Sequence, residues 1–177
     1  MRRHEVSFVV DAPPHRVWRL FHPKVQPGDV VPRTIEHPGG SITILREGDE
    51  HGAGLVRTAT FPVPRWLFSG GIARSWEVVT EARKNEYARY QAVGKPLWST
   101  AEGWHTLEAL DDGTRTRLTF VETYHAHNPV LRALFEGRVH RFISDDNGKI
   151  YETILGYVGA VTREPPVAPG EVDRPGG

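Results

Sequence analysis

The sequence predicts an α+β fold in which a curved antiparallel sheet closes around one long helix near the C-terminus. Three observations lead to this fold class. Strand patterns recur between residues 4 and 125, turn-forming residues separate several of them, and a helical apolar pattern then covers residues 128–161. Short connections between neighbouring strands favour antiparallel pairing. At 177 residues the chain is long enough for one domain with its own core.

The first element is a strand over residues 4–10, in which Val6, Phe8 and Val10 form an apolar face. Two prolines end it, and a short helix follows, with apolar residues at helical spacing at positions 17, 18 and 21. Residues 27–40 are rich in proline and glycine, which predicts a connecting loop, either irregular or with a second short helix within it.

Six further strands are predicted, which gives the sheet seven strands in total. Their ranges are 41–47, 54–61, 73–82, 86–93, 101–110 and 114–125. Turn residues stand between several of these strands, as at positions 111–113.

The last element is a helix over residues 128–161, with Asn128 as its N-cap and apolar residues at steps of three and four. Asp146 falls near the centre of the apolar stripe. The helix therefore either lines a cavity that contains something polar or buries an acid against a partner. Residues 1–163 form the predicted domain, and residues 164–177, rich in proline and glycine, form a flexible tail.

Composition argues against several classes of function. Lysine plus arginine equal aspartate plus glutamate at 22 each, so no net field favours nucleic acid or an anionic membrane. The absence of cysteine excludes disulfides, thiolate metal sites and a cysteine nucleophile. The sequence has neither a signal-peptide block nor an apolar run of membrane-spanning length. We expect a cytoplasmic protein that neither inserts stably into membranes nor binds nucleic acid.

Three short motifs carry a resemblance to a known superfamily. They are Val10-Asp11-Ala12-Pro13-Pro14-His15-Arg16-Val17-Trp18, Gly52-Ala53-Gly54-Leu55-Val56-Arg57 and Asp112-Gly113-Thr114-Arg115. With the C-terminal helix, they make residues 4–160 resemble the START-like (SRPBCC) superfamily, and within it the group of polyketide cyclases, dehydrases and lipid transport proteins. The resemblance implies a helix-grip fold with a deep apolar cavity that binds a hydrophobic or amphipathic molecule. It does not imply one reaction, because the superfamily includes carriers, receptors, cyclases and regulators.

Four polar residues are candidates for catalysis or for orienting a ligand: Asp146, Glu122, Tyr124 and His105. Asp146 is either a general acid or ligand anchor, or a carboxylate whose hydrogen bonds only satisfy the core. Glu122 and Tyr124 follow an inward apolar pattern toward the cavity mouth and suit acid–base chemistry, unless Glu122 lies at a solvated rim. His105 is either an inward base or anchor, or a histidine satisfied by a backbone carbonyl or placed on the outer face.

Large aromatic side chains are candidates for the wall of the cavity: Trp76, Tyr90, Phe120, Phe135 and Phe142. Residues 61–71 form an apolar segment that contains two prolines, Trp66 and Phe68 and ends in two glycines. This segment is a lid that touches the ligand, a homodimer contact or core filling, and the sequence leaves the three open.

No metal and no cofactor are expected. His125 and His127 could place two imidazoles on one side of a strand, but the sequence shows no third ligand at suitable spacing. The glycines of residues 52–54 do not form a nucleotide motif, because Arg57 stands where a dinucleotide fingerprint has its third glycine.

The leading hypothesis is therefore binding of a hydrophobic or lipid-like small molecule in the cavity. The first alternative is an enzyme of the polyketide cyclase/dehydratase type, for which two acid–base groups must reach one bound carbonyl. The second alternative is a regulatory or interaction protein that docks through the segment around Trp66.

Overall fold

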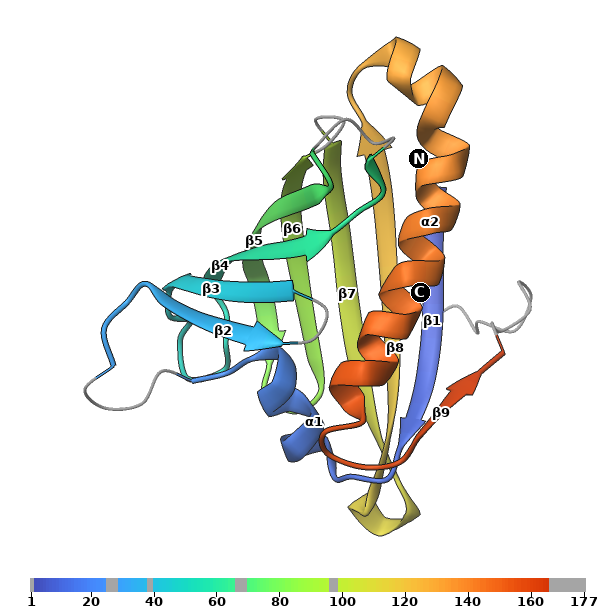
Figure 1. The fold of residues 1–177 in the computed structure, drawn as a ribbon. Helices are drawn as coiled ribbons and strands as arrows, with labels where there is room; N and C mark the ends of the chain where they lie inside the picture. The colour runs from blue at the N-terminus through green and yellow to red at the C-terminus, as the bar shows by residue number, and fades with distance from the viewer. Residues whose placement is uncertain (1, 25–28, 38–39, 66–69, 96–98, 166–177) are drawn as a thin grey trace, which may run out of the picture.

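The computed structural model describes residues 2–24, 29–37, 40–65, 70–95 and 99–165. This part of the chain forms nine strands and two α-helices (Figure 1). The strands are β1 Arg2–Val10, β2 Arg33–His37, β3 Gly40–Arg46, β4 Val56–Pro62, β5 Ile72–Arg83, β6 Tyr87–Lys95, β7 Ser99–Leu110, β8 Arg115–Ala126 and β9 Val161–Glu164. The helices are α1 Pro14–Phe21 and α2 Pro129–Leu155.

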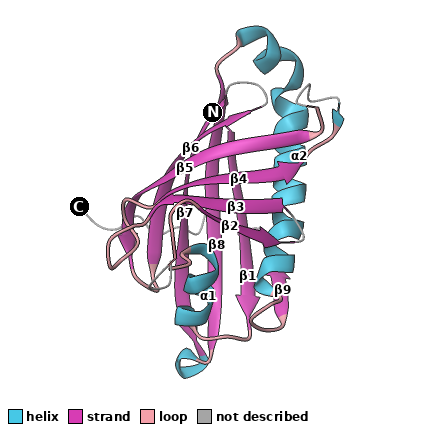
Figure 2. Cartoon of the chain, turned by 60° about the vertical axis from the view of Figure 1, so that its left-hand side comes forward, coloured by secondary structure: helices cyan, strands magenta, loops and turns pink. Residues whose placement is uncertain are grey.

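All nine strands belong to one sheet in the order β2-β3-β4-β5-β6-β7-β8-β1-β9, and all neighbours pair antiparallel. The sheet is strongly curved: β7, β8 and β1 run nearly vertically in Figure 1, whereas β2, β3 and β4 cross the view nearly horizontally. Figure 2, turned by 60°, shows the same crossing of the two groups. α2 runs along the vertical group and contacts β1 and β8. The concave face is therefore the one that α2 covers.

The short helix α1 begins where Pro14 occupies its first turn, a position in which the missing N–H of proline costs nothing. Val17, Trp18 and Phe21 are its buried residues, at the helical spacing that the sequence predicts. α1 contacts β7, β8 and α2, so it closes one end of the space between sheet and helix. The residue after it, His22, is also buried.

The apolar core lies on the concave face. Val6 and Phe8 of β1 are buried and lie directly opposite Phe120 and Leu118 of β8. Because side chains alternate along a strand, these four residues face the same side of the sheet. Leu155, at the end of α2, is fully buried and belongs to the same core cluster.

The prediction of seven strands is wrong, because the sheet also contains β2 and β9. β2 lies inside the loop predicted for residues 27–40 and pairs with β3 from Arg33 opposite Ile44 to His37 opposite Gly40. Five residues give too short a pattern to separate a strand from a loop. The strand exists because its backbone groups pair with a neighbour.

The predicted helix over residues 128–161 is too long, since α2 ends at Leu155. Beyond it the chain passes the backbone of Asp11 so closely that a Cβ on Gly159 would lie 2.3 Å from the Asp11 carbonyl oxygen. Val161 then starts β9 beside β1. Glu164, which the sequence assigns to the tail, pairs with Ser7 in that strand.

Neither helix in the described part of the chain is both long and apolar enough to cross a membrane.

Candidate functional site

A buried ion pair joins β4 and β5 on the concave face. Arg57 Nε donates to Glu77 Oε2 at 2.8 Å, and the two side chains are only 12% and 15% exposed. Arg57 Nη1 also donates to the carbonyl oxygen of Phe21 at 2.7 Å, and the Ser75 hydroxyl donates to Glu77 Oε1 at 3.2 Å. Burial acts to lower the pKa of Arg57, but the charge and hydrogen bond of Glu77 raise it overall, so the guanidinium stays charged. The pair also ties the end of α1 to the sheet.

A second set of polar side chains lies where β6, β7 and β8 pair side by side. Tyr90 is opposite Gly103, and Gly103 is opposite Glu122. A Cβ on Gly103 would lie 2.5 Å from the Tyr90 hydroxyl, so the tyrosine side chain lies across this glycine. It reaches Glu122 and hydrogen-bonds with its carboxyl group. The missing side chain at position 103 is what allows the two residues to meet.

Tyr151 of α2 completes this group from the opposite side. Its ring stacks on Phe120 with centroids 4.0 Å apart and an angle of 3° between the planes. It also hydrogen-bonds with Tyr90, and the charges of Glu122, Glu77 and Arg57 act on it. We call Arg57, Glu77, Tyr90, Glu122 and Tyr151 the polar interior cluster. Four strands and one helix supply it.

Burial sets the acid–base behaviour of this cluster. It raises the pKa of Glu122 to about 7, with the negative charge of Glu77 adding to the shift and the Tyr90 hydrogen bond opposing it. Burial and the charge of Glu122 also raise the pKa of Tyr90 and of Tyr151, so both phenols keep their protons near neutral pH. Glu122 can therefore take up or release a proton at neutral pH.

Two histidines meet beside the cluster, at the end closed by α1. The Nε2 atoms of His22 and His105 lie 3.2 Å apart, and Trp18 stacks on His22 with centroids 3.9 Å apart. Burial, and after it the neighbouring His105 and Arg57, lower the pKa of His22 to about 2. Burial and then Arg57 lower the pKa of His105 to about 3. Both imidazoles are therefore neutral. We call these two residues the histidine pair.

The structure brings together four of the residues that the sequence proposes. Glu122 and Tyr90 belong to the polar interior cluster, and His105 and Phe120 pack beside it, with ring centroids 5.3 Å apart. Tyr124 is buried on the same face of β8 as Glu122, one inward position further along.

Trp76 lies elsewhere. Its side chain is 40% exposed, because Ser75 and Glu77 on either side of it face inward and alternation places Trp76 on the convex face. Trp76 is therefore not part of the site. The remaining proposed residues lie outside the described part of the structure: Trp66 and Phe68 entirely, and Asp146, Phe135 and Phe142 in their side chains.

Four residues of the site were missed from the sequence: Arg57, Glu77, Tyr151 and His22. Arg57 ends the motif Gly52–Arg57, and Glu77 follows Trp76, the residue that was assumed to face inward. Tyr151 directly follows Ile150 of the apolar stripe on α2. The alternation along β5 is a signal that points to Glu77, because it places Glu77 on the same face as the apolar Val79.

The backbone amides of the glycine-rich turn before β4 donate their hydrogen bonds within the turn itself. Asp49 Oδ1 accepts the backbone N–H groups of His51, Gly52 and Ala53 at 2.9, 2.8 and 2.9 Å. These amides are occupied within the turn, so they are not a cradle for a phosphate.

No family model matches the sequence, and no curated protein matches it either. Solved structures do match. The aromatase/cyclase ZhuI from Streptomyces sp. R1128 has a TM-score of 0.60 and 19% identity, over 89% of this chain and 93% of that one. The chain has the START-like helix-grip fold.

Two further solved structures with this START-like fold have similar scores. Ara h 8.0201 gives a TM-score of 0.59 at 19% identity, over 89% of this chain and 97% of that one. A START superfamily protein from Mycobacterium smegmatis gives 0.60 at 13% identity, over 88% and 97%. The resemblance drawn from the sequence motifs is therefore confirmed for the fold, and function must be argued from the site.

Proposed function

We propose that the protein binds a hydrophobic or amphipathic small molecule between the concave face of the sheet and α2. The observation that carries this proposal is the polar interior cluster, which places an ion pair, a carboxyl group and two phenols among the apolar side chains of the core. A buried ion pair usually stabilises a protein no more than apolar residues of similar volume would. The attraction between its two charges seldom exceeds the free energy that their desolvation costs. Polar groups that converge inside an apolar pocket are typical of ligand sites.

The surroundings of the cluster indicate the kind of ligand. Phe21, Phe120 and Tyr151 pack ring against ring, with centroid distances between 4.0 and 6.1 Å. An apolar body would lie against these rings, while one polar group of the ligand meets Glu122 and Tyr90. An amphipathic molecule with its polar group at one end fits this arrangement best.

The experiment is a titration of delipidated protein with N-phenyl-1-naphthylamine, whose fluorescence rises in apolar surroundings. Saturable binding is expected. Ala92→Phe, which adds a ring at a buried inward position of β6, should weaken binding by roughly tenfold or more. Gln91→Phe adds the same ring at the exposed neighbouring position and should leave it unchanged. Absence of saturation, or equal effects of both variants, would contradict the proposal. Native mass spectrometry of freshly purified protein would identify co-purified ligands.

A second candidate function is acid–base catalysis of the polyketide cyclase/dehydratase type. The observation that favours it is the pKa of Glu122, which burial raises to about 7, where general acids and bases work best at neutral pH. ZhuI, which is named an aromatase/cyclase, has a similar fold. With a linear polyketone thioester as substrate, Glu122→Gln should abolish turnover and spare binding if the protein is an enzyme, whereas a carrier would change only in affinity.

A further inference from the structure

The histidine pair contains two buried nitrogen atoms that lack hydrogen-bond partners. His22 and His105 are only 7% and 3% exposed, and their Nε2 atoms bond to each other. The Nδ1 atom of each ring is buried without a partner among the described residues. Buried polar atoms nearly always have a partner, because an unmade hydrogen bond is costly. Two such atoms in one contact call for an explanation.

The contact between the rings couples their protonation. A hydrogen bond between two Nε2 atoms needs one donor and one acceptor, and each neutral imidazole has a single N–H. The ring that donates through Nε2 therefore has a lone pair on Nδ1, and the ring that accepts has its proton on Nδ1. His22 thus determines whether His105 Nδ1 donates or accepts.

The two Nδ1 atoms have different surroundings. A Cβ on Gly52 would lie 3.1 Å from His22 Nδ1, so this atom faces the backbone of the turn before β4. His105 instead has aromatic neighbours, with the Phe120 ring centroid at 5.3 Å, Phe21 at 5.7 Å and Trp18 at 5.8 Å. His105 is therefore the histidine whose ring lies among aromatic side chains, the setting that suits a flat apolar molecule.

Charge restricts the group that His105 can bind. Both imidazoles are neutral, because burial lowers their pKa values, and the nearby Arg57 already pairs with Glu77. A carboxylate would lose its hydration here without gaining a cation of its own. A hydroxyl is neutral and can donate or accept, so it fits His105 in either protonation pattern.

We propose that His105 Nδ1 binds a neutral hydroxyl group of a flat, aromatic ligand, and that His22 is a positioning residue that fixes the proton of His105. This inference rests on the proposed function, because the ligand must enter the interior. It adds the chemical class of the ligand, a phenol or similar aromatic alcohol rather than a fatty acid.

Three probes of equal shape test the class of ligand. Delipidated protein at pH 7 is titrated calorimetrically with naphthalene, 2-naphthol and 2-naphthoate. We expect 2-naphthol to bind roughly tenfold more tightly than naphthalene, as one additional hydrogen bond to an otherwise unpaired atom allows, and 2-naphthoate to bind most weakly. Equal affinities for naphthalene and 2-naphthol would overturn the inference and leave the proposed function intact. Failure of all three to bind would refute the proposed function, and this inference with it.

Variants locate the hydroxyl. His105→Phe keeps an aromatic ring and should remove the preference for 2-naphthol over naphthalene, whereas His127→Phe, at an exposed position between β8 and α2, should keep it. A preference that survives His105→Phe would place the hydroxyl elsewhere and overturn the inference.

Nitrogen NMR tests the role of His22 without depending on affinity. The ¹⁵N shifts of the His105 ring should change when 2-naphthol is added to the wild-type protein. In His22→Phe, the proton distribution between the two His105 nitrogens should differ from that of the wild type before any ligand is added. Unchanged distributions would show that His22 only fills space. The wild-type titration remains decisive if a variant does not fold.

Discussion

Among the arginine–glutamate pairs that bridge neighbouring strands of this sheet, two lie on opposite faces and can be compared directly. Arg57 and Glu77 join β4 to β5 on the concave face, with Nε and Oε2 2.8 Å apart. Arg89 and Glu102 join β6 to β7 on the convex face, with Nε and Oε1 2.9 Å apart. The inner side chains are 12% and 15% exposed, and the outer ones 44% and 35%.

The two ion pairs have nearly the same N–O distance but differ in their exposure to solvent. Water and salt screen the outer pair, so it adds little to stability. The inner pair has lost most of its hydration, and each charge depends on the other. Removing one partner should therefore cost much more stability in the inner pair than in the outer pair, although the two pairs have similar geometry.

The largest expected effect is that of Glu77→Gln. It removes the ion-pair partner of the Arg57 charge, which keeps its hydrogen bond to the Phe21 carbonyl, and should lower the free energy of unfolding by about 3 kcal/mol or more. Urea unfolding measures this change. A loss as small as that of Glu102→Gln would show that water reaches Arg57 and that the two faces do not differ.

Glu122 extends the comparison to pH. Its pKa rises from 4.5 to about 7 on folding, so the folded state holds the proton more tightly than the unfolded state. Stability should therefore fall as pH rises from about 4.5 to 7, by on the order of 3 kcal/mol in full. Glu122→Gln should be more stable than the wild type at pH 8 and similar to it at pH 4. A wild-type minus variant difference that is flat with pH would contradict the buried position of this carboxyl group.

Gly103→Ala tests whether the inner face is packed as described. Its Cβ would meet the Tyr90 ring, and such overpacking should cost about 1–3 kcal/mol. Gly94→Ala is the matched control, a strand glycine whose added Cβ would have its nearest contact at an ordinary 3.5 Å. Thermal unfolding of the two variants should differ clearly, and Tyr90→Ala should relieve the cost at Gly103. Equal losses for the two alanines would contradict this arrangement of Tyr90.

The smallest expected effect is that of Glu102→Gln on the convex face. The stability loss should be slight at low ionic strength and should vanish when salt is added, since the pair is solvent-exposed. Urea titrations at two salt concentrations check this. A large loss that persists in salt would mean that the convex face is covered by another surface.

Much of the fold follows from local pattern. The strands β4 to β8 were predicted within a few residues, because alternation and turn residues are local signals. β2 and β9 were not, since each is short and exists through pairing with a distant strand. The end of α2 depends on the passage of Gly159 beside Asp11, which no window of sequence reveals.

The site was predicted only in part for a related reason. Apolar neighbours on the same strand make Glu122 and His105 candidates for the inward face, and the structure places both side chains on that face. Trp76 is a candidate for the wall because a large aromatic residue is usually buried, whereas the structure places it on the convex face of β5. That Glu77 faces Arg57 depends on the register between strands, which the alternation along one strand does not determine.

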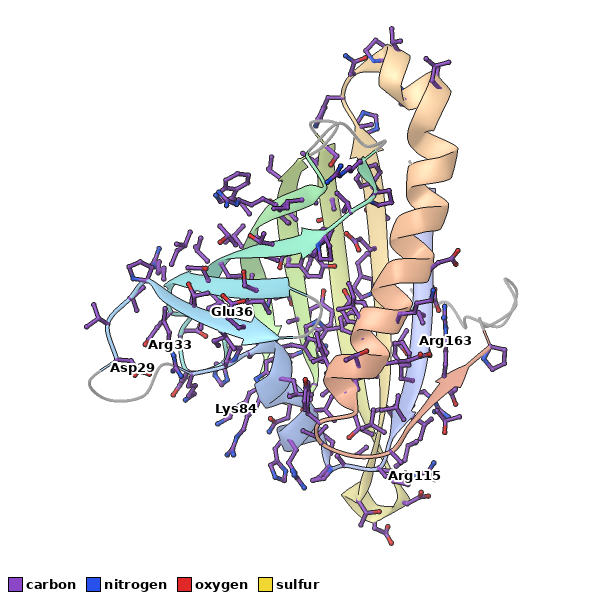
Figure 3. All side chains as sticks on the ribbon, viewed as in Figure 1. Asp29, Arg33, Glu36, Lys84, Arg115 and Arg163 are labelled. Carbon is purple, nitrogen blue, oxygen red and sulfur yellow. The ribbon has the colours of Figure 1, made fainter. Side chains whose placement is uncertain are left out.

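The two edges of the sheet share one more property. β2 is only five residues long and directly follows Pro32, and β9 is only four residues long and directly precedes Pro165. Figure 3 labels charged residues of both edge strands, Arg33 and Glu36 of β2 and Arg163 of β9. Short, charged strands flanked by proline offer a poor template to a foreign strand. Edge-to-edge aggregation is thus discouraged at both borders of the sheet that the described residues form.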